Sequence, residues 1–362
     1  MANGVKFRLK LLIDEKINKV VLAEAEQDFV DVLLSLLTLP MGKIASLLEN
    51  HKTDLDCYKN LNKSVADMDI GHFETEACKS MLLYPVTSKD IHRKRLKLNM
   101  GYTHPTEFFV CPSFFRTDSC GSSVYSNFKT SICSCGALMN APIQVSEEQQ
   151  TAGEVIGDVS DGVFVNCRSS FIVTDDLKVT SNSIGVIMNG LKDLGYTGYS
   201  DLQETLVDVG FEEVVTLLGC LFTSEAPLTC TFLRKTCMTS KMMHEMLSPP
   251  ALKNGEANPG GVCYVKAFVR KVDREILYVE CNEDFVDSLL SFLVQPLEMA
   301  CSLSNDNTIL GCVGNLCRSQ CRGAASKSCY LPGFYICSNN NLIDYAYKST
   351  RYRCWIPHDG NL

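Results

Sequence analysis

The chain has 362 residues, a formal net charge of −8 and a hydrophobic content of 46%. This length exceeds that of one average domain and predicts two or three folded units. The hydrophobic content excludes a globally disordered chain. The acidic balance argues against a protein that wraps nucleic acid with its whole surface.

The N-terminal stretch predicts neither a secretory signal nor a membrane span. MANGVKFRLKLLIDEK passes from a short apolar run directly into charged residues, without a small-residue cleavage site. The longest apolar run, VDVLLSLLTLPM, contains Asp31 and Pro40 and is far shorter than the roughly 20 residues of a spanning helix. We therefore expect an intracellular protein, cytoplasmic or nuclear or both, without membrane contact.

Residues 7–41 predict a β-hairpin that leads into a buried helix. The runs KFRLKLLID and KVVLAEA flank the polar segment EKIN, in which Asn18 suits a turn. The helix FVDVLLSLL is apolar nearly all round, with Asp28 as its expected N-cap, Asp31 in its first turn and Pro40 at its end. Two carboxylates one turn apart also fit a catalytic pair. No partner acid, base or metal ligand lies nearby in sequence, so we interpret both as structural.

A basic run follows at residues 90–100, DIHRKRLKLNM. It contains Arg93, Lys94, Arg95 and Lys97 directly after His92. Such a run fits a nuclear-import or nucleic-acid patch. No aromatic side chains for base stacking are interleaved with the charges, which favours a solvated linker.

Four cysteines within 25 residues form the most chemically specific pattern of the chain, namely Cys111, Cys120, Cys133 and Cys135. Four thiolates can close a tetrahedral zinc site, and glycine directly after the last cysteine suits a tight turn. The intervening gaps of eight, twelve and one residues differ from the short pairs of familiar zinc modules. Because four cysteine ligands leave no open position, such a zinc site would be structural.

Two other interpretations of this cluster stay open. The chain holds 19 cysteines, which a reducing compartment keeps as thiols or metal ligands, so the four could be ordinary buried thiols. Cys133 and Cys135 could instead form a redox pair. Their spacing, however, lacks the helix-start context that lowers a thiol pKa.

Residues 160–240 predict a further strand and helix region. SSFIVTDDLKVT predicts two strands around an acidic turn at Asp175 and Asp176. SIGVIMNGLKDLG predicts a helix with Ser183 as its cap and Gly195 as its stop. SDLQETLV opens with Ser200 and Gln203 at capping-box spacing and predicts a second helix, and FEEVVTLLGCLF predicts a third.

An internal repeat organises the chain. Residues 8–41 and 264–297 match without a gap at an offset of 256 residues. The recurring residues are Asp28, Phe29, Val30, Asp31, Leu33, Leu34, Ser35, Leu37 and Pro40, found again as Asp284, Phe285, Val286, Asp287, Leu289, Leu290, Ser291, Leu293 and Pro296. EFFVC at 107–111 then matches GFYIC at 333–337, so the second copy is shortened.

The repeat predicts an organisation into two related units. The first is complete, the second is truncated, and a segment rich in proline, glycine and asparagine joins them flexibly. The predicted ranges are 1–245 for the first unit (hairpin–helix lobe 1–105, cysteine knuckle 106–145, strand–helix lobe 160–240), 246–261 for the linker and 262–362 for the second unit.

Three quoted segments together resemble one known family. LKLLIDEKINKVVLAEAEQDFVDVLLSLLTLPMG, FFVC…CSCGALM and SSFIVTDDLKVT…LTCTFL are similar to the plant-specific family called domain of unknown function 674. The resemblance covers nearly the whole chain and implies a flowering-plant protein with a cysteine-containing knuckle. It implies no activity, substrate or catalytic residue.

The sequence therefore predicts an α+β protein of two related units, each starting with a β-hairpin packed on a buried helix, with a cysteine-rich β knuckle in the first. No P-loop, dinucleotide fingerprint, nucleophile elbow or His-Glu-X-X-His helix occurs. We assign no catalytic or cofactor-binding residue and expect a non-enzymatic interaction or scaffold protein with protein partners and structural zinc. The alternatives are a zinc-dependent nucleic-acid-binding protein and an enzyme with an unfamiliar site.

Overall fold

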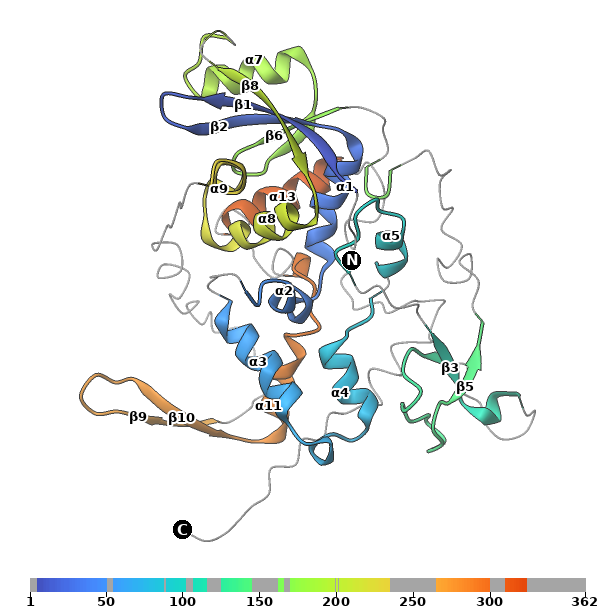
Figure 1. The fold of residues 1–362 in the computed structure, drawn as a ribbon. Coiled ribbons are helices and arrows are strands. Elements are labelled where there is room, and N and C mark those ends of the chain that lie inside the picture. Colours follow the sequence, from blue (N-terminus) through green and yellow to red (C-terminus); the bar gives the residue numbers. More distant parts are fainter. Residues whose placement is uncertain are drawn as a thin grey trace, which may run out of the picture.

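The computed structural model has an α+β fold, as the sequence predicts, and Figure 1 shows its arrangement. It describes residues 5–50, 55–87, 89–101, 107–115, 125–144, 162–165, 170–198, 200, 202–234, 265–299 and 310–323. No helix in these ranges has both the length and the apolar character needed to cross a lipid bilayer. The predicted linker at 246–261 lies outside the described residues.

Ten strands and thirteen helical segments are described. The strands are β1 (Phe7–Asp14), β2 (Lys19–Ala25), β3 (Phe108–Val110), β4 (Tyr125–Ser126), β5 (Ala141–Ile143), β6 (Phe171–Thr174), β7 (Val179–Ser181), β8 (Gln203–Val209), β9 (Val265–Val269) and β10 (Ile276–Cys281). The α-helices are α1 (Gln27–Ser35), α2 (Met41–Leu47), α3 (Asp56–Asp67), α4 (Glu76–Leu83), α5 (Asp90–Lys94), α7 (Ile184–Asp193), α8 (Phe211–Thr223), α9 (Pro227–Phe232), α11 (Glu283–Ser291) and α13 (Gly311–Gly323). Short 3-10 turns are η1 (Leu36–Thr38), η2 (Ile70–His72) and η3 (Pro112–Phe115).

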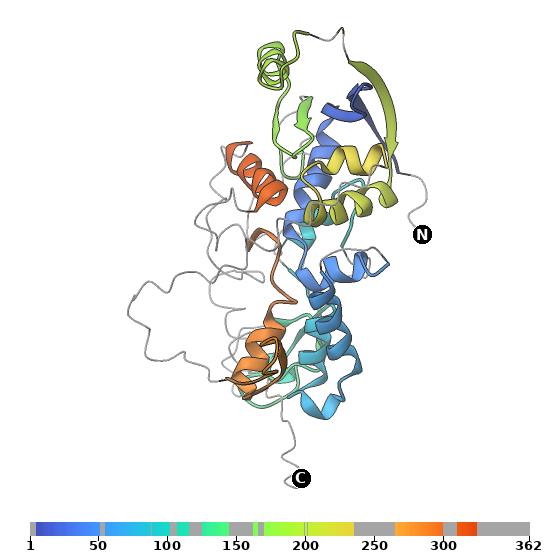
Figure 2. The same cartoon turned by 90° about the vertical axis from the view of Figure 1, so that its left-hand side faces the viewer.

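The central layer is a five-stranded antiparallel sheet in the order β7-β6-β2-β1-β8. Alternate residues of β1 point to opposite faces, and helices pack on both faces. Leu9 and Leu11 belong to the main core with α1 and α8, whereas Leu12 packs with Ile187 and Leu191 of α7. Figure 2 shows α7 on one side of the strands and α8 with α9 on the other. The face toward α7 is covered only in part, because it also carries the charged side chains of Arg8, Lys10 and Glu24.

Strand β8 overturns one expectation. The capping-box spacing of Ser200 and Gln203 predicted a helix here, but Gln203–Val209 is a strand that pairs with β1 from Phe7 to Ile13. A capping box offers two local hydrogen bonds, whereas the open edge of β1 offers a ladder along the whole segment. The predictions of Ser183 as a helix cap and Gly195 as a stop are confirmed.

Helix α1 is buried as predicted, but its ends differ from the prediction. The helix begins at Gln27 after Glu26, so Asp28 lies in the first turn and is not the N-cap. Asp28 forms an ion pair with Lys97. The α-helix already ends at Ser35, the 3-10 turn η1 follows, and Pro40 is the residue that precedes α2.

The hairpin β9–β10 repeats the geometry of β1–β2. Pairing positions correspond at the sequence offset of 256 residues, including a register irregularity at the same place in each hairpin. The ion pair between Lys10 and Glu24, 3.0 Å, recurs between Lys266 and Glu280, 3.2 Å. The helix that follows, α11, buries only Leu290, so the second motif is much more open than the first.

The two hairpin–helix motifs meet at equivalent residues. Pro40 and Pro296 form an antiparallel bridge. The amide of Met41 donates to the carbonyl of Gln295 at 2.8 Å, and Leu297 donates to Leu39 at 3.0 Å. Because each bond is the equivalent of the other under the repeat offset, the contact has the reciprocal form of a two-fold interface.

Two further helices, α3 and α13, each pack against the motif from the other half of the chain. Cys57, Asn60, Leu61 and Ser64 of α3 recur at an offset of 255 residues as Cys312, Asn315, Leu316 and Ser319 of α13. Helix α3 packs with α11 in one apolar cluster, whereas α13 contacts α1 and enters the main core. Figure 1 shows α3 beside α11 and α13 below the sheet. The sheet likewise takes strands from both the 1–105 and 160–240 segments. The proposed unit boundaries stay a prediction.

Candidate metal centre and buried charged groups

The cysteine knuckle is built on a small antiparallel sheet in the order β4-β3-β5. Phe108 packs edge-on against Tyr125 with ring centroids 5.2 Å apart, which joins β3 to β4. Cys111 directly follows β3 and is buried in a small cluster with Cys133 and Met139. The aromatic strand residues therefore position the first thiol.

A tight turn at residues 131–139 positions the next two cysteines. The amide of Gly136 donates to the carbonyl of Cys133, and the amide of Cys133 donates to Ala137, each at 2.8 Å. Gly136 has φ +87°, in the left-handed region that glycine adopts at little cost. The glycine that follows Cys135 is thus required by the turn, in agreement with the local sequence prediction.

Three sulfur atoms converge in the knuckle. Cys111 Sγ and Cys135 Sγ lie 3.5 Å apart, and the Sγ atoms of Cys111, Cys133 and Cys135 all lie within 4.8 Å of one another. Tetrahedral zinc with metal–sulfur bonds near 2.3 Å requires sulfur atoms about 3.8 Å apart. The three thiols therefore have a spacing that fits a metal. Cys120, the fourth predicted ligand, lies outside the described residues.

Cysteines elsewhere differ in character from this cluster. Burial raises the pKa of Cys312 to about 12 and also raises the pKa of Cys78, so both are core thiols with little thiolate character. Cys317 is disulfide-bonded, so the expectation that all cysteines are thiols or metal ligands is wrong for this residue. Only the knuckle brings three cysteines together among the residues that the structure describes.

The basic run at residues 90–100 is not a uniformly solvated linker. The Arg93 side chain is 1% exposed, and its guanidinium donates to the carbonyl and hydroxyl of Thr38, each at 2.8 Å. Arg93 also forms an ion pair with Asp90. The local sequence does not predict the burial of Arg93, because the two oxygens that accept from its buried NH1 group belong to Thr38, 55 positions earlier.

Asp31 has a structural role, as interpreted from the sequence, but through contacts that its position in the helix does not predict. Its carboxylate accepts hydrogen bonds from the amides of Val163, Phe164 and Val165 at 2.7 to 3.0 Å. Burial nevertheless raises the pKa of this carboxyl, because desolvation outweighs the three donors. Asp31 thus attaches the 162–165 segment to α1.

Asp175 is a second buried carboxylate with a structural role, and it lies in the predicted acidic turn. It accepts bonds from the amide and the hydroxyl of Thr229, at 2.9 and 2.7 Å. The same hydroxyl accepts from the amide of Val20 at 2.9 Å. This chain of bonds connects the hairpin, the β6–β7 turn and α9, and it explains why an aspartate in a turn is buried.

Asp287 is the repeat equivalent of Asp31, but its surroundings differ. Its Oδ1 atom is buried and has no hydrogen-bond partner in the described part of the chain. Burial raises the pKa of Asp287 to about 7, and the carboxylates of Glu283 and Asp284 act in the same direction. In the first motif three amides donate to the carboxylate of Asp31, whereas among the described residues no donor reaches Oδ1 of Asp287.

The raised pKa of Asp287 predicts a pH dependence of stability. The folded state binds a proton more tightly than the unfolded chain, whose aspartate has its usual pKa of 3.8. The contribution of Asp287 to the unfolding free energy therefore falls as pH rises from about 4 to about 7. We expect Asp287→Asn to remove this decline, as measured by urea unfolding at pH 5 and pH 8. Equal pH dependence in the two proteins would contradict the assignment.

The fold and the thiol cluster define an α+β protein with a cysteine-rich knuckle as its candidate site. The chain belongs to the family described as "Protein of unknown function (DUF674)", whose model matches residues 3–360. The family predicted from the three sequence segments is thereby confirmed. No curated protein and no solved structure matches the chain.

Proposed function

We propose that this protein is a non-enzymatic interaction or scaffold protein, in which structural zinc stabilises the knuckle. The convergence of Cys111, Cys133 and Cys135 carries the proposal of zinc. Cys120 supplies the fourth thiolate in this proposal. Four thiolates fill the tetrahedral coordination of zinc, so the metal would hold β3 and the 131–139 turn together and would take no substrate.

The buried charged groups support a role without catalysis. Asp14, Asp31, Arg93 and Asp175 are the buried charged side chains of the described residues. Their hydrogen-bond partners are backbone groups, threonine or tyrosine hydroxyls, or a neighbouring ion pair. Such partners fix segments of the chain to one another. A catalytic acid or base would instead present its reactive atom toward a substrate.

The nucleic-acid alternative is less well supported by the described residues. Its basic patch was expected to include Arg93, whose guanidinium is buried against Thr38. Lys97 forms an ion pair with Asp28. We therefore propose protein partners, and binding to RNA or DNA that weakens steeply with salt would overturn this preference.

The zinc proposal predicts a metal content of about one zinc per chain, as in a single four-cysteine site. The measurement is plasma mass spectrometry on protein purified without added metal and without a histidine tag. The double variant Cys133→Ser and Cys135→Ser should lose the zinc, because serine is a poor ligand for this metal. The matched control is Cys57→Ser with Cys281→Ser, two thiols outside the cluster. Folded wild-type protein without metal would contradict the proposal.

A further inference from the structure

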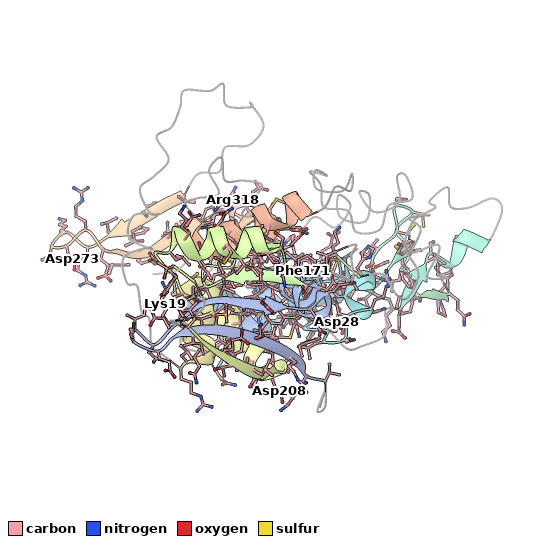
Figure 3. The ribbon with its side chains drawn as sticks, turned by 90° about the horizontal axis from the view of Figure 1, so that it is seen from above. Lys19, Asp28, Phe171, Asp208, Asp273 and Arg318 are labelled. Atoms are coloured by element: carbon pink, nitrogen blue, oxygen red, sulfur yellow. The ribbon has the colours of Figure 1, made fainter. Side chains whose placement is uncertain are left out.

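The hairpin β9–β10 exposes its strands in an unusual way. Among the described residues, β9 and β10 pair only with each other, so both outer edges of the hairpin lack a neighbouring strand. Apolar side chains are exposed along it, including Val265 at 46%, Ile276 at 61% and Tyr278 at 54%. Figures 1 and 3 show the hairpin projecting from the body of the molecule, with Asp273 at its tip. Open apolar edges are strand-pairing surfaces.

In the first motif, neighbouring strands cover both edges of the equivalent hairpin, β1–β2. Strand β8 pairs with β1, and strand β6 pairs with β2 along Leu22 to Ala25, which correspond to Tyr278 to Cys281 of β10. Leu9 is fully buried there, whereas its equivalent, Val265, is exposed. The difference lies in the neighbouring strands, because the hairpins themselves have the same register.

The Oδ1 atom of Asp287 lacks a hydrogen-bond partner among the described residues. We attribute this to the same difference between the two motifs, namely the neighbouring segment that only the first motif has among the described residues. In the first motif the amides that bind Asp31 come from residues 163–165, which precede β6 in the chain. One segment, residues 162–174, therefore supplies both the donors for Asp31 and the strand beside β2. The second motif lacks a described counterpart of both contacts, at Asp287 and at β10.

We propose that Asp287 and the β10 edge together bind an extended peptide segment of a partner protein, with a glycine-led apolar sequence like that of residues 162–174. The backbone of this segment adds a strand to β10, and its first amides donate to the Asp287 carboxylate. Strand addition of this kind takes affinity from backbone hydrogen bonds and specificity from alternate side chains. A second copy pairing β10 with β10 would cover the edge but would not bring the connected amides to Asp287. The inference deepens the proposed interaction role and does not depend on zinc, so the two experiments can fail separately.

The test uses a labelled synthetic peptide of residues 162–174, GVFVNCRSSFIVT with Cys167→Ser, added to the full chain. We expect saturable binding, measured by fluorescence anisotropy. Asp287→Asn should weaken binding about tenfold or more, because charge-assisted hydrogen bonds to the carboxylate are lost. Asp284→Asn is the matched control, since it removes an exposed carboxylate of the same helix. Because the charge of Asp284 raises the pKa of Asp287, its loss keeps the Asp287 carboxylate ionised and should not weaken binding.

A second arm changes the peptide and leaves the protein intact, so that misfolding of a variant cannot imitate the result. N-methylation at the positions of Val163 and Phe164 removes the two leading donors and should also weaken binding about tenfold or more. A scrambled peptide should not bind. Binding that is equal for wild type and Asp287→Asn would place the peptide elsewhere, for example on the first motif, and would overturn the proposal. Absence of binding, with or without self-association of the chain, would overturn it as well.

Discussion

Replacing Asp31 with asparagine is expected to lower the unfolding free energy by about 2–4 kcal/mol. The carboxylate accepts three amides, with Val163 on Oδ2 and the other two on Oδ1. Asparagine keeps one oxygen but places an NH₂ group where the second oxygen was, so at least one buried amide faces another donor. The loss of charge-assisted bonds and the unsatisfied amide act in the same direction. Chemical denaturation followed by circular dichroism measures the effect.

The neighbouring aspartate provides the control for this prediction. Asp28→Asn removes the ion pair with Lys97, whose side chain is 61% exposed. Surface ion pairs contribute up to about 1 kcal/mol, so this variant should lose much less stability than Asp31→Asn. Similar losses in the two variants would mean that the amide contacts of Asp31 contribute little.

Arg93→Met is expected to destabilise the fold by about 3–5 kcal/mol, the cost of removing one partner from a buried charged network. Methionine fills much of the space of the arginine stem but offers no donor to the Thr38 carbonyl. Asp90 would keep the bond from the Thr87 amide, 2.7 Å, and lose its countercharge. Urea unfolding monitored by circular dichroism measures the difference from wild type.

Two further variants show whether the position or the charge matters. Lys94→Ala changes the adjacent exposed cation and should cost less than about 1 kcal/mol. Arg93→Lys keeps the charge but cannot reproduce the planar fork that reaches Thr38 and Asp90 together, so we expect an intermediate loss. Unchanged stability in Arg93→Met would contradict the role assigned to this side chain.

The elements that the sequence predicted correctly depend on contacts within a few residues. The first hairpin, the Ser183 cap and the Gly195 stop each have their determinants in one short window. The knuckle turn belongs to the same group, because Gly136 and Cys133 hydrogen-bond across it. Cys133 and Cys135 could therefore be recognised from the sequence as a candidate half-site. Strand β3, which directly precedes Cys111, brings the third thiol to them.

What the sequence did not predict depends on contacts between residues that lie far apart in the chain. Residues 203–209 form a strand because β1 offers a free edge nearly 200 residues earlier in the chain, which no local pattern conveys. Arg93 is buried because Thr38 offers two oxygens, and Asp31 is buried because a segment more than 130 residues later offers three amides. From sequence spacing alone, a buried cation and a solvated cation look alike.

The sequence by itself determined the α+β class, the first hairpin and its buried helix, the family, and the local turn that holds Cys133 and Cys135. These follow from side-chain periodicity and turn chemistry, which act over short distances. Only the tertiary structure decided which charged groups are buried and that the two motifs meet at Pro40 and Pro296. It also decided that Asp31 binds three amides, whereas Oδ1 of Asp287 has no donor among the residues that the structure describes. The physical reason is that the cost of burying a polar group depends on the partners that the rest of the fold brings to it.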